Sequence, residues 1–203
     1  EYETVQAAAA ETGGQGRNIH PGYAKDKMIN AVQVACEINA LLPAAQRPEH
    51  TEGYEGFYHL VGLEGTVERA SLEYIIRDHS HKKFKAKKRY LADAVALLGE
   101  KYGEGVIRLT LKDQYYNMRE KIEPYPEVIE KAMEAMRQAG VAPIVRPIRG
   151  GTDGARLSYM GLPCPNLFTG GMNFHGKFEY CSVDTMQRAV QTIINLARIW
   201  SES

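Results

Sequence analysis

A run of small and polar residues near position 150 is the part of the sequence best suited to chemistry. Residues 148–154 read Ile-Arg-Gly-Gly-Thr-Asp-Gly. Adjacent glycines let a backbone approach a ligand closely, and the start of a helix attracts anions. Arg149 adds a planar guanidinium that can bind a carboxylate with two hydrogen bonds. The alternative is a tight turn from a strand into a helix, capped by Thr152 or Asp153. The spacing matches neither G-x-G-x-x-G nor a P-loop, which argues against a nucleotide.

Two histidines lie in segments that could present an imidazole to a ligand. His175 is surrounded by the flexible residues of segment 170–179, and it could bind a metal with Glu179 supporting it. His20 lies in Asn-Ile-His-Pro-Gly at the entry to a predicted helix. There it could donate a hydrogen bond to a developing oxyanion. For each histidine, the alternative is an exposed loop residue that bonds only within its own turn.

Two further clusters resemble sites but have simpler explanations. Asp78-His79-Ser80-His81 resembles a metal tripod, yet we expect a strand-to-helix turn there, capped by Ser80, with both histidines in solvent. Residues 82–89 contain six basic side chains. Because a helix distributes these around its surface, a solvated helix is the default and a phosphate-binding patch the alternative.

Charge and cysteine usage narrow the classes of partner and compartment. The 203 residues contain 25 Lys and Arg and 25 Asp and Glu, so the formal net charge is zero. We therefore expect neither nucleic acid nor a membrane as partner, and no apolar run is long enough to span a bilayer. The three cysteines are odd in number and far apart, which argues against a disulfide framework and favours the cytoplasm.

Hydrophobic periodicity predicts an α/β protein whose first part has the order β-α-β-β-α-β. Two helices on one face of a small antiparallel sheet suit this order. The expected elements are a strand at about 1–10, a Gly-rich turn, a helix at 24–42, a hairpin of strands 57–63 and 66–77, a helix at 81–101 and a strand at 106–111.

The pattern changes near residues 113–120, where we place a domain boundary. Beyond it we expect a helix from Pro126 to Gly140, short strands at 144–145 and 166–168, and a last helix at 183–200 with an apolar stripe. Residues 1–5 read as a strand already under way, without a start Met. We take this as a sign of a domain cut from a longer protein.

Several blocks, taken in order, closely resemble the peptidase T family of tripeptide aminopeptidases, and the resemblance covers nearly the whole chain. The blocks are TEGYEGFY at 51–58, GTVERA at 65–70, YIIRD at 74–78, YYNMRE at 115–120, PIRGGTDGA at 147–155 and GLPCPNLFTGG at 161–171. In that family a lid and dimerisation domain is inserted into a zinc-peptidase domain. The resemblance implies a lid at residues 5–117 and the C-terminal part of the catalytic domain at 118–203.

The resemblance also implies roles for four residues. His175 matches the last metal ligand, and Arg149 an arginine that binds the C-terminal side of the peptide. His20 matches a lid histidine that reaches the active site of the partner subunit and polarises the scissile carbonyl. Arg77 matches a lid arginine that contacts substrate.

The implied activity is that of a homodimer, joined through the lid, that releases the N-terminal residue of a tripeptide. Two divalent metals, usually zinc, would activate a water with the help of a Glu. The other metal ligands and this Glu would lie upstream of residue 1, so we expect the isolated chain to be inactive. Phe178 stands where the family often has a His, and residues 11–16 stand where it has an alternating strand.

Two other classes of function compete with the enzyme. A non-catalytic module for dimerisation or peptide binding would need only the residues present. A nucleic-acid-binding module would rest on the basic helix alone.

Overall fold

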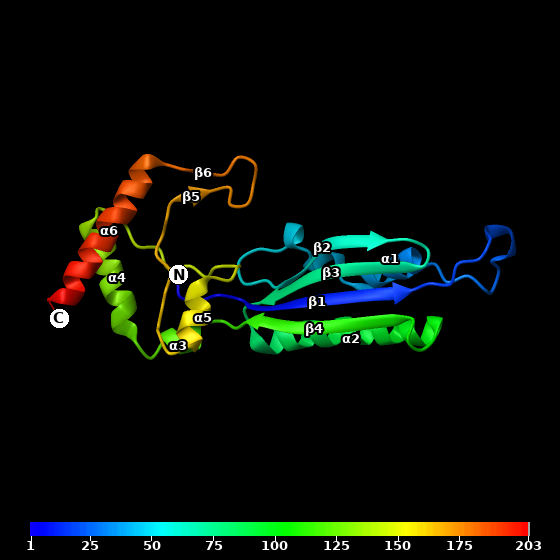
Figure 1. Ribbon diagram of the computed structural model, residues 1–203. Coiled ribbons are helices and arrows are strands. Elements are labelled where there is room, and N and C mark those ends of the chain that lie inside the picture. The colour runs from blue at the N-terminus through cyan, green and yellow to red at the C-terminus, as the bar shows by residue number, and fades with distance from the viewer. Residues whose placement is uncertain (203) are drawn as a thin grey trace. The chain divides into compact units, whose positions relative to one another are not determined.

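The computed structural model describes residues 1–202, which form two compact units (Figure 1). Val5–Tyr116 make up the first, which we call the sheet unit. Glu1–Thr4 join the residues from Asn117 onward in the second, the terminal unit. No helix within residues 1–202 is both long and apolar enough to cross a membrane.

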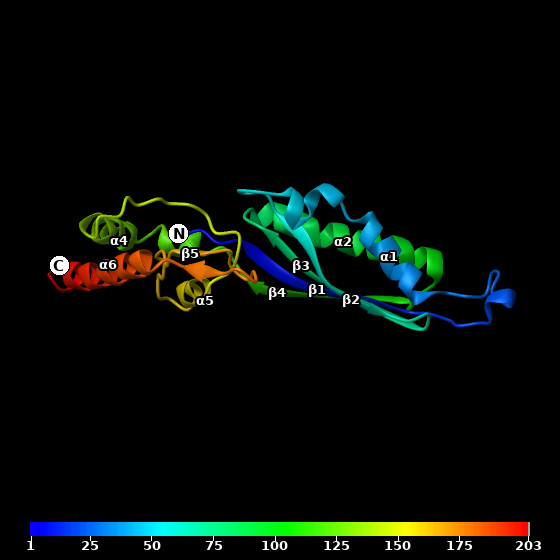
Figure 2. The same cartoon turned by 90° about the horizontal axis from the view of Figure 1, so that it is seen from above.

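The sheet unit contains one antiparallel sheet of four strands in the order β2-β3-β1-β4. Two helices, α1 and α2, cover one face of this sheet (Figure 2). The bounds are β1 Gln6–Gln15, α1 Ala31–Leu41, β2 Phe57–Gly65, β3 Arg69–Asp78, α2 His81–Tyr102 and β4 Ile107–Tyr115. The predicted fold class and the two helices on one face of the sheet are confirmed.

The core of the sheet unit lies between the sheet and its helices. Alternate residues of β3, namely Leu72, Tyr74 and Ile76, face the helices and are almost fully buried. Phe84 and Leu91 of α2 pack against them with no exposed surface. Burying one such side chain contributes about 1.5–3 kcal/mol, so this layer dominates the stability of the unit.

Local signals set the bounds of both helices. Ser80 caps α2 by accepting a hydrogen bond from the backbone N–H of Lys83, as predicted. The first helix begins later than predicted, at Ala31, because the Asn30 side chain accepts hydrogen bonds from two following amides. Met28 therefore lies outside the helix, and Pro43, which cannot continue a helix, follows its end.

The predicted Gly-rich turn at the end of the first strand is wrong. β1 continues through Gly13 and Gly14 to Gln15, paired with β3 to Gln15 and with β4 to Gly14. A Cβ atom on Gly13 would lie 2.8 Å from the carbonyl oxygen of Ala70. On Gly16 it would overlap the carbonyl oxygen of Val67. These glycines allow a close approach of neighbouring backbones and do not reverse the chain.

The terminal unit contains four helices and one short hairpin among the described residues. Their bounds are α3 Arg119–Ile122, α4 Pro126–Gln138, α5 Asp153–Tyr159, β5 Gly171–Met172, β6 Tyr180–Cys181 and α6 Val183–Ser201. The helices predicted to start at Pro126 and at residue 183 are confirmed, as is a short helix after the glycines at 150–151.

The two strands predicted in this unit, at 144–145 and 166–168, do not form within the described residues. Ile144 and Val145 are 67% and 50% exposed. Asn166 exchanges backbone hydrogen bonds only with Glu1, its N–H lying 2.8 Å from the carbonyl oxygen of Glu1. An extended segment becomes a strand only when a neighbour supplies a hydrogen-bonded ladder, and these segments have none.

Helix α6 carries its apolar stripe on the side that faces solvent. Val190 and Ile193 are 56% and 57% exposed, whereas the polar Thr192 and Asn195 are buried. The Asn195 amide donates to the carbonyl of Ala135 in α4, at 3.3 Å. The helix therefore packs on α4 through its polar side and leaves open the apolar face that a helix normally buries.

Candidate functional site

Arg77, the predicted lid arginine, lies in a row of residues that crosses all four strands. β-Sheet register places Phe57, Arg77, Ala7 and Tyr115 directly beside one another. Side chains alternate along a strand, so Arg77 lies on the face opposite to Tyr74 and Ile76, away from the helices. The small side chain of Ala7 leaves room for Arg77 and Tyr115 to meet above it.

The guanidinium of Arg77 is held by aromatic neighbours. Its central carbon lies 5.9 Å from the ring centroid of Phe57. Burial raises the pKa of the Tyr115 hydroxyl, and the charge of Arg77 acts in the opposite direction. Arg77 is half-buried. It can therefore offer a pre-positioned cation to a carboxylate or carbonyl on the open face of the sheet.

His20 lies in a loop that leaves the far end of β1. Backbone hydrogen bonds between Arg17 and Ile29, of 2.8 and 3.1 Å, close the base of this loop. Gly16 permits that closure because a side chain there would strike the backbone. His20 itself is exposed and precedes a turn of 3-10 helix, η1 (Pro21–Tyr23).

The ring of His20 is oriented by its own turn. Its Nδ1 accepts a hydrogen bond from the backbone N–H of Gly22 at 3.1 Å, and the ring of Tyr23 lies 5.5 Å away. A neutral imidazole that accepts at Nδ1 carries its proton on Nε2. The exposed His20 therefore presents an N–H donor outward, which is the form that an oxyanion requires.

The structure separates His20 from Arg77 within the sheet unit. Arg77 pairs with Ala7 at the start of β1, and the His20 loop follows Gln15 at its end (Figure 1). A strand rises about 3.3 Å per residue, so this stretch of β1 spans about 26 Å. The two residues of one chain cannot contact the same small substrate.

Arg149 lies where an extended segment enters helix α5. It follows Ile148, whose N–H donates to the carbonyl of Glu3 at 2.9 Å, and it precedes two glycines. Thr152 is the N-cap of α5, but its side chain makes no capping hydrogen bond. Gly154 is buried, and a Cβ atom there would overlap the carbonyl oxygen of Cys164. Gly154 thus lets α5 approach Cys164 closely. The half-buried Arg149 lies just before the start of this helix.

His175 lies at the tip of the hairpin between β5 and β6. It is exposed and adopts a left-handed conformation with φ of 64°, as does Asn173 with 57°. The Glu179 carboxylate accepts a hydrogen bond from the backbone N–H of His175 at 2.9 Å. Glu179 therefore supports the main chain of this tight turn, whereas the sequence had suggested support of the imidazole. The ring is left facing solvent on a constrained backbone.

Residues 1–202 contain no group of three His, Cys, Asp or Glu side chains placed to hold a metal ion. His175 supplies one nitrogen, whereas a catalytic zinc site takes three protein ligands. The residues of this chain do not by themselves fit the metal centre that the family resemblance implies.

The cluster at 78–81 is part of the fold. Asp78 is 1% exposed and accepts a hydrogen bond from the backbone N–H of Ser80 at 2.9 Å. The ammonium of Lys87 lies 3.9 Å from its other oxygen. The expectation that both histidines are solvated is wrong for His79, which is 8% exposed and packs 4.9 Å from the ring of Tyr54.

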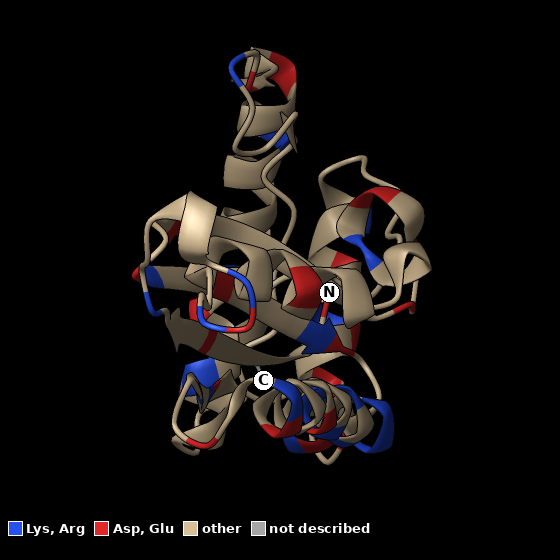
Figure 3. Ribbon diagram, turned by 90° about the vertical axis from the view of Figure 1, so that its right-hand side faces the viewer, with Lys and Arg blue, Asp and Glu red and all other residues tan. Residues whose placement is uncertain are grey.

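The basic residues of α2 are partly neutralised by neighbouring carboxylates. Lys88 lies 2.6 Å from Asp113, and Arg89 lies 3.7 Å from Asp93. Figure 3 shows Lys and Arg interspersed with Asp and Glu along the ribbon. The helix presents both signs of charge, as a solvated helix does.

A pocket on the helix side of the sheet unit has no signal in the sequence. Its cavity of about 320 Å³ lies beside the C-terminal end of α1, strand β2 and the loop that carries η2 (Ala44–Gln46) and η3 (Pro48–His50). We call it the Arg47 pocket. Its walls include Leu42, Arg47, Glu49, Tyr58, Leu60 and Tyr74. Only the fold brings residues so far apart in sequence together.

Residues 2–105, which make up half of the chain, match the family described as the peptidase dimerisation domain. The chain belongs to this family. The match covers most of the sheet unit, including His20, Arg77 and the Arg47 pocket.

Relatives extend the similarity to the whole chain. The chain is 55% identical to a protein of Clostridium acetobutylicum named Peptidase T, over 100% of its own length and 50% of the relative. A Peptidase T of Alkaliphilus oremlandii is 54% identical to the chain. This match covers 100% of the chain and 49% of the relative. The chain thus spans about half the length of the curated relatives that it matches.

Solved structures show the same fold. A tripeptidase from Staphylococcus aureus matches with a TM-score of 0.84 at 16% sequence identity. The match covers 100% of this chain and 53% of the tripeptidase chain. The aminopeptidase PepT from Bacillus cereus matches with a TM-score of 0.76 at 17% identity. The match covers 96% of this chain and 52% of the PepT chain.

Proposed function

We propose that this chain is part of a metal-dependent aminopeptidase that removes the N-terminal residue from tripeptides and works as a homodimer. One observation carries the proposal: the chain is 53–55% identical, over its whole length, to proteins named Peptidase T. Identity at this level extends across both units, so it does not rest on the dimerisation domain alone.

In this proposal residues 5–117 form the lid and dimerisation domain, and residues 118–203 belong to the catalytic domain. His175 provides one ligand to a metal centre, which we propose holds two zinc ions, and the rest of the protein provides the others. Bound metal would supply the activation of a water molecule. We place the enzyme in the cytoplasm.

His20 is proposed to donate a hydrogen bond from Nε2 to the oxygen of the scissile carbonyl in the partner subunit. Two features support this role. Its Nδ1 already accepts from Gly22, which leaves the proton on the exposed nitrogen. The length of β1 also keeps His20 away from Arg77 of its own chain, so a site containing both residues needs two chains.

Arg77 and Arg149 are proposed to bind the peptide. A tripeptide ends in a carboxylate, which a guanidinium binds with two charge-assisted hydrogen bonds. Arg149 would take this carboxylate, and Arg77 would contact the substrate from the lid. The aromatic residue beside Arg77 fixes its direction before substrate arrives.

The proposal is tested on the full-length protein that contains this chain. We expect it to release the N-terminal residue from tripeptides much faster than from tetrapeptides, to lose activity with a chelator and to regain it with zinc. Quantifying the released amino acid by mass spectrometry measures this. A zinc-loaded, dimeric protein that leaves tripeptides intact would overturn the proposal.

A narrower function, dimerisation without catalysis, is favoured for the chain by itself. No three potential metal ligands are grouped within residues 1–202, and half of the chain matches a dimerisation domain. Sedimentation of the 203-residue chain tests this: a dimer without peptidase activity supports it, and a monomer at micromolar concentration contradicts it.

A further inference from the structure

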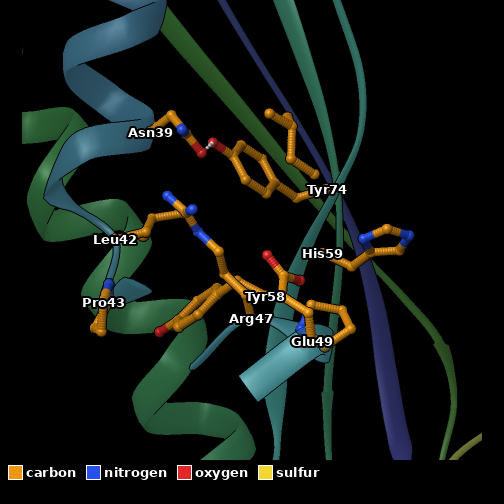
Figure 4. A pocket seen from close by; sticks show the side chains of 10 residues that line it. Asn39, Leu42, Pro43, Arg47, Glu49, Tyr58, His59 and Tyr74 are labelled. Atoms are coloured by element: carbon orange, nitrogen blue, oxygen red, sulfur yellow. Dashed lines mark hydrogen bonds between the residues drawn. The ribbon is translucent and has the colours of Figure 1, made fainter. Parts of the chain in front are cut away.

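The Arg47 pocket lies entirely within the sheet unit, on the face of the sheet that carries the helices. Figure 4 shows the side chains of Arg47 and Glu49 extending into the space between α1 and β2. Tyr74 forms part of the wall and donates a hydrogen bond to Asn39 at 3.0 Å. Arg77, three residues along the same strand, points to the other face. The pocket therefore does not use the residues that the proposed peptidase uses.

The guanidinium of Arg47 is a half-buried charge that the fold leaves unpaired. It makes no hydrogen bond or ion pair with any of residues 1–202. Arg47 lies between the 3-10 turns η2 and η3, and Pro48 follows it directly, which limits where its backbone can move. A guanidinium is planar and carries five N–H donors, so in a pocket it can bind a carboxylate with two hydrogen bonds.

Glu49 adds the opposite charge at the same pocket. It is exposed, and its carboxylate is likewise unpaired within the described chain. In Figure 4 the carboxylate of Glu49 and the guanidinium of Arg47 do not meet, and the open space of the pocket lies between them. A ligand that carries both a carboxylate and an ammonium group would satisfy both residues.

The remaining walls are mixed, because Asn39 and His59 add polar groups to an otherwise apolar lining. Leu42 and Tyr58 are 7% and 4% exposed, and Leu60 is half-buried beside them. The cavity of about 320 Å³ is at the small end of the range for ligand sites, about 300–1,000 Å³. The apolar part of this lining, Leu42, Tyr58 and Leu60, suits a compact apolar side chain.

We propose that the Arg47 pocket binds a free amino acid with an apolar side chain, such as leucine. The carboxylate binds Arg47, the ammonium group binds Glu49, and the side chain packs against Leu42, Tyr58 and Leu60. The reaction proposed above would release compounds of this class. The binding site does not depend on that reaction, because none of its residues has a role there.

The test is calorimetric titration of the 203-residue chain with leucine. We expect a dissociation constant on the order of 0.1–1 mM, as suits a ligand of this size. N-acetylleucine lacks the ammonium group, leucinamide lacks the carboxylate and glycine lacks the apolar side chain. Each should bind about tenfold more weakly or worse. Inorganic phosphate should not compete with leucine.

Variants assign the site. Arg47→Gln should weaken leucine binding about tenfold or more, and Glu49→Gln several-fold. Arg89→Gln is the matched control and should bind leucine normally, because the Arg89 side chain is 82% exposed on α2 and does not line the pocket. Should Arg47→Gln fail to fold, Arg47→Lys keeps the charge without the planar fork and should still bind more weakly.

NMR locates the ligand independently of the variants. Leucine should shift the amide signals of Tyr58, Leu60 and Tyr74. If no binding is seen at a leucine concentration on the order of 10 mM, which is tenfold above the weakest expected dissociation constant, the proposal is overturned. Equal binding by Arg47→Gln, competition by phosphate, or signal changes confined to other residues would overturn it too.

Discussion

The sheet unit and the terminal unit differ in what their apolar side chains contact. In the sheet unit both helices bury their apolar stripes, and Ile76 and Phe84 have no exposed surface. In the terminal unit the stripe of α6 is open, with Ile193 57% exposed and the polar Asn195 buried. The first unit completes a core within residues 5–116, whereas the second holds only one layer of a core.

Backbone pairing shows the same contrast. Each strand of the sheet unit has a hydrogen-bonded neighbour along its length. Segments 144–145 and 166–168 of the terminal unit have comparable β-forming residues but no ladder. Strand formation therefore depends on a partner more than on the propensity of the segment itself.

The largest expected effect compares one core residue of each unit. Phe84→Ala should lower the free energy of unfolding by about 3–5 kcal/mol, because it leaves a cavity under α2. Ile193→Ala in α6 should change it by less than about 0.5 kcal/mol, because that side chain is exposed. Guanidinium unfolding followed by circular dichroism measures both. Similar losses for the two variants would show that α6 is covered in solution.

The second prediction compares His20 of the sheet unit with His175 of the terminal unit in the full-length protein, which we propose is a peptidase. His20→Ala should lower kcat more than it weakens substrate binding, with a loss of about 3–4 kcal/mol in transition-state stabilisation. His175→Ala should abolish activity, because it removes the proposed metal ligand.

Mixing these two inactive proteins tests whether His20 acts across the dimer. A mixed dimer has one site with its own His175 and a partner that still carries His20. With random exchange, activity should recover to about a quarter of wild type. If mass spectrometry shows exchange and activity stays at background, His20 does not act on its partner.

The third prediction concerns the close backbone approach at the base of the His20 loop. Gly16→Ala should destabilise the sheet unit by about 1–3 kcal/mol, because its methyl group meets the carbonyl oxygens of Val67 and Ile29. Gly99→Ala is the matched control in α2, where nothing lies near the added methyl group. It should stabilise the protein by up to about 1 kcal/mol. Thermal unfolding of both variants distinguishes a steric effect from a general glycine effect.

The smallest expected effect is a pH dependence. Hydrogen bonds from Lys101 and Tyr102 lower the pKa of Glu37, so this carboxylate ties α1 to α2. A lowered pKa contributes stability above the unfolded value of about 4.3, and that stability is lost as the pH falls through the folded pKa. Glu37→Gln should therefore be slightly less stable than wild type at pH 7, and the difference should vanish at low pH.

Glu134 in α4 provides the control for that prediction. Hydrogen bonds from Gln138 and Arg137 lower its pKa too, but all three residues lie on one helix. Glu134→Gln should leave the main unfolding transition unchanged at every pH, since it joins no two elements. Equal pH effects for the two variants would contradict the inter-helix role of Glu37.

Local sequence signals determined much of the sheet unit. Ser80 and Pro43 marked helix ends because capping and the missing N–H of proline act within one turn. Phe84, Leu91, Val95 and Leu98 recur at helical spacing in the sequence, and they form the buried side of α2. The family resemblance rested on contiguous blocks, and it too could be read without a structure.

Contacts between distant segments decided the rest. From the sequence, Gly13 and Gly14 were predicted to form a turn. They belong to strand β1 because they pair closely with the backbone of β3. The separation of His20 from Arg77 depends on the register of β1, and the Arg47 pocket on where α1 ends above β2. The stripe of α6 was visible in the sequence, but which side meets α4 was not. A periodic pattern fixes which residues share a face, whereas the burial of that face depends on the neighbours that the fold supplies.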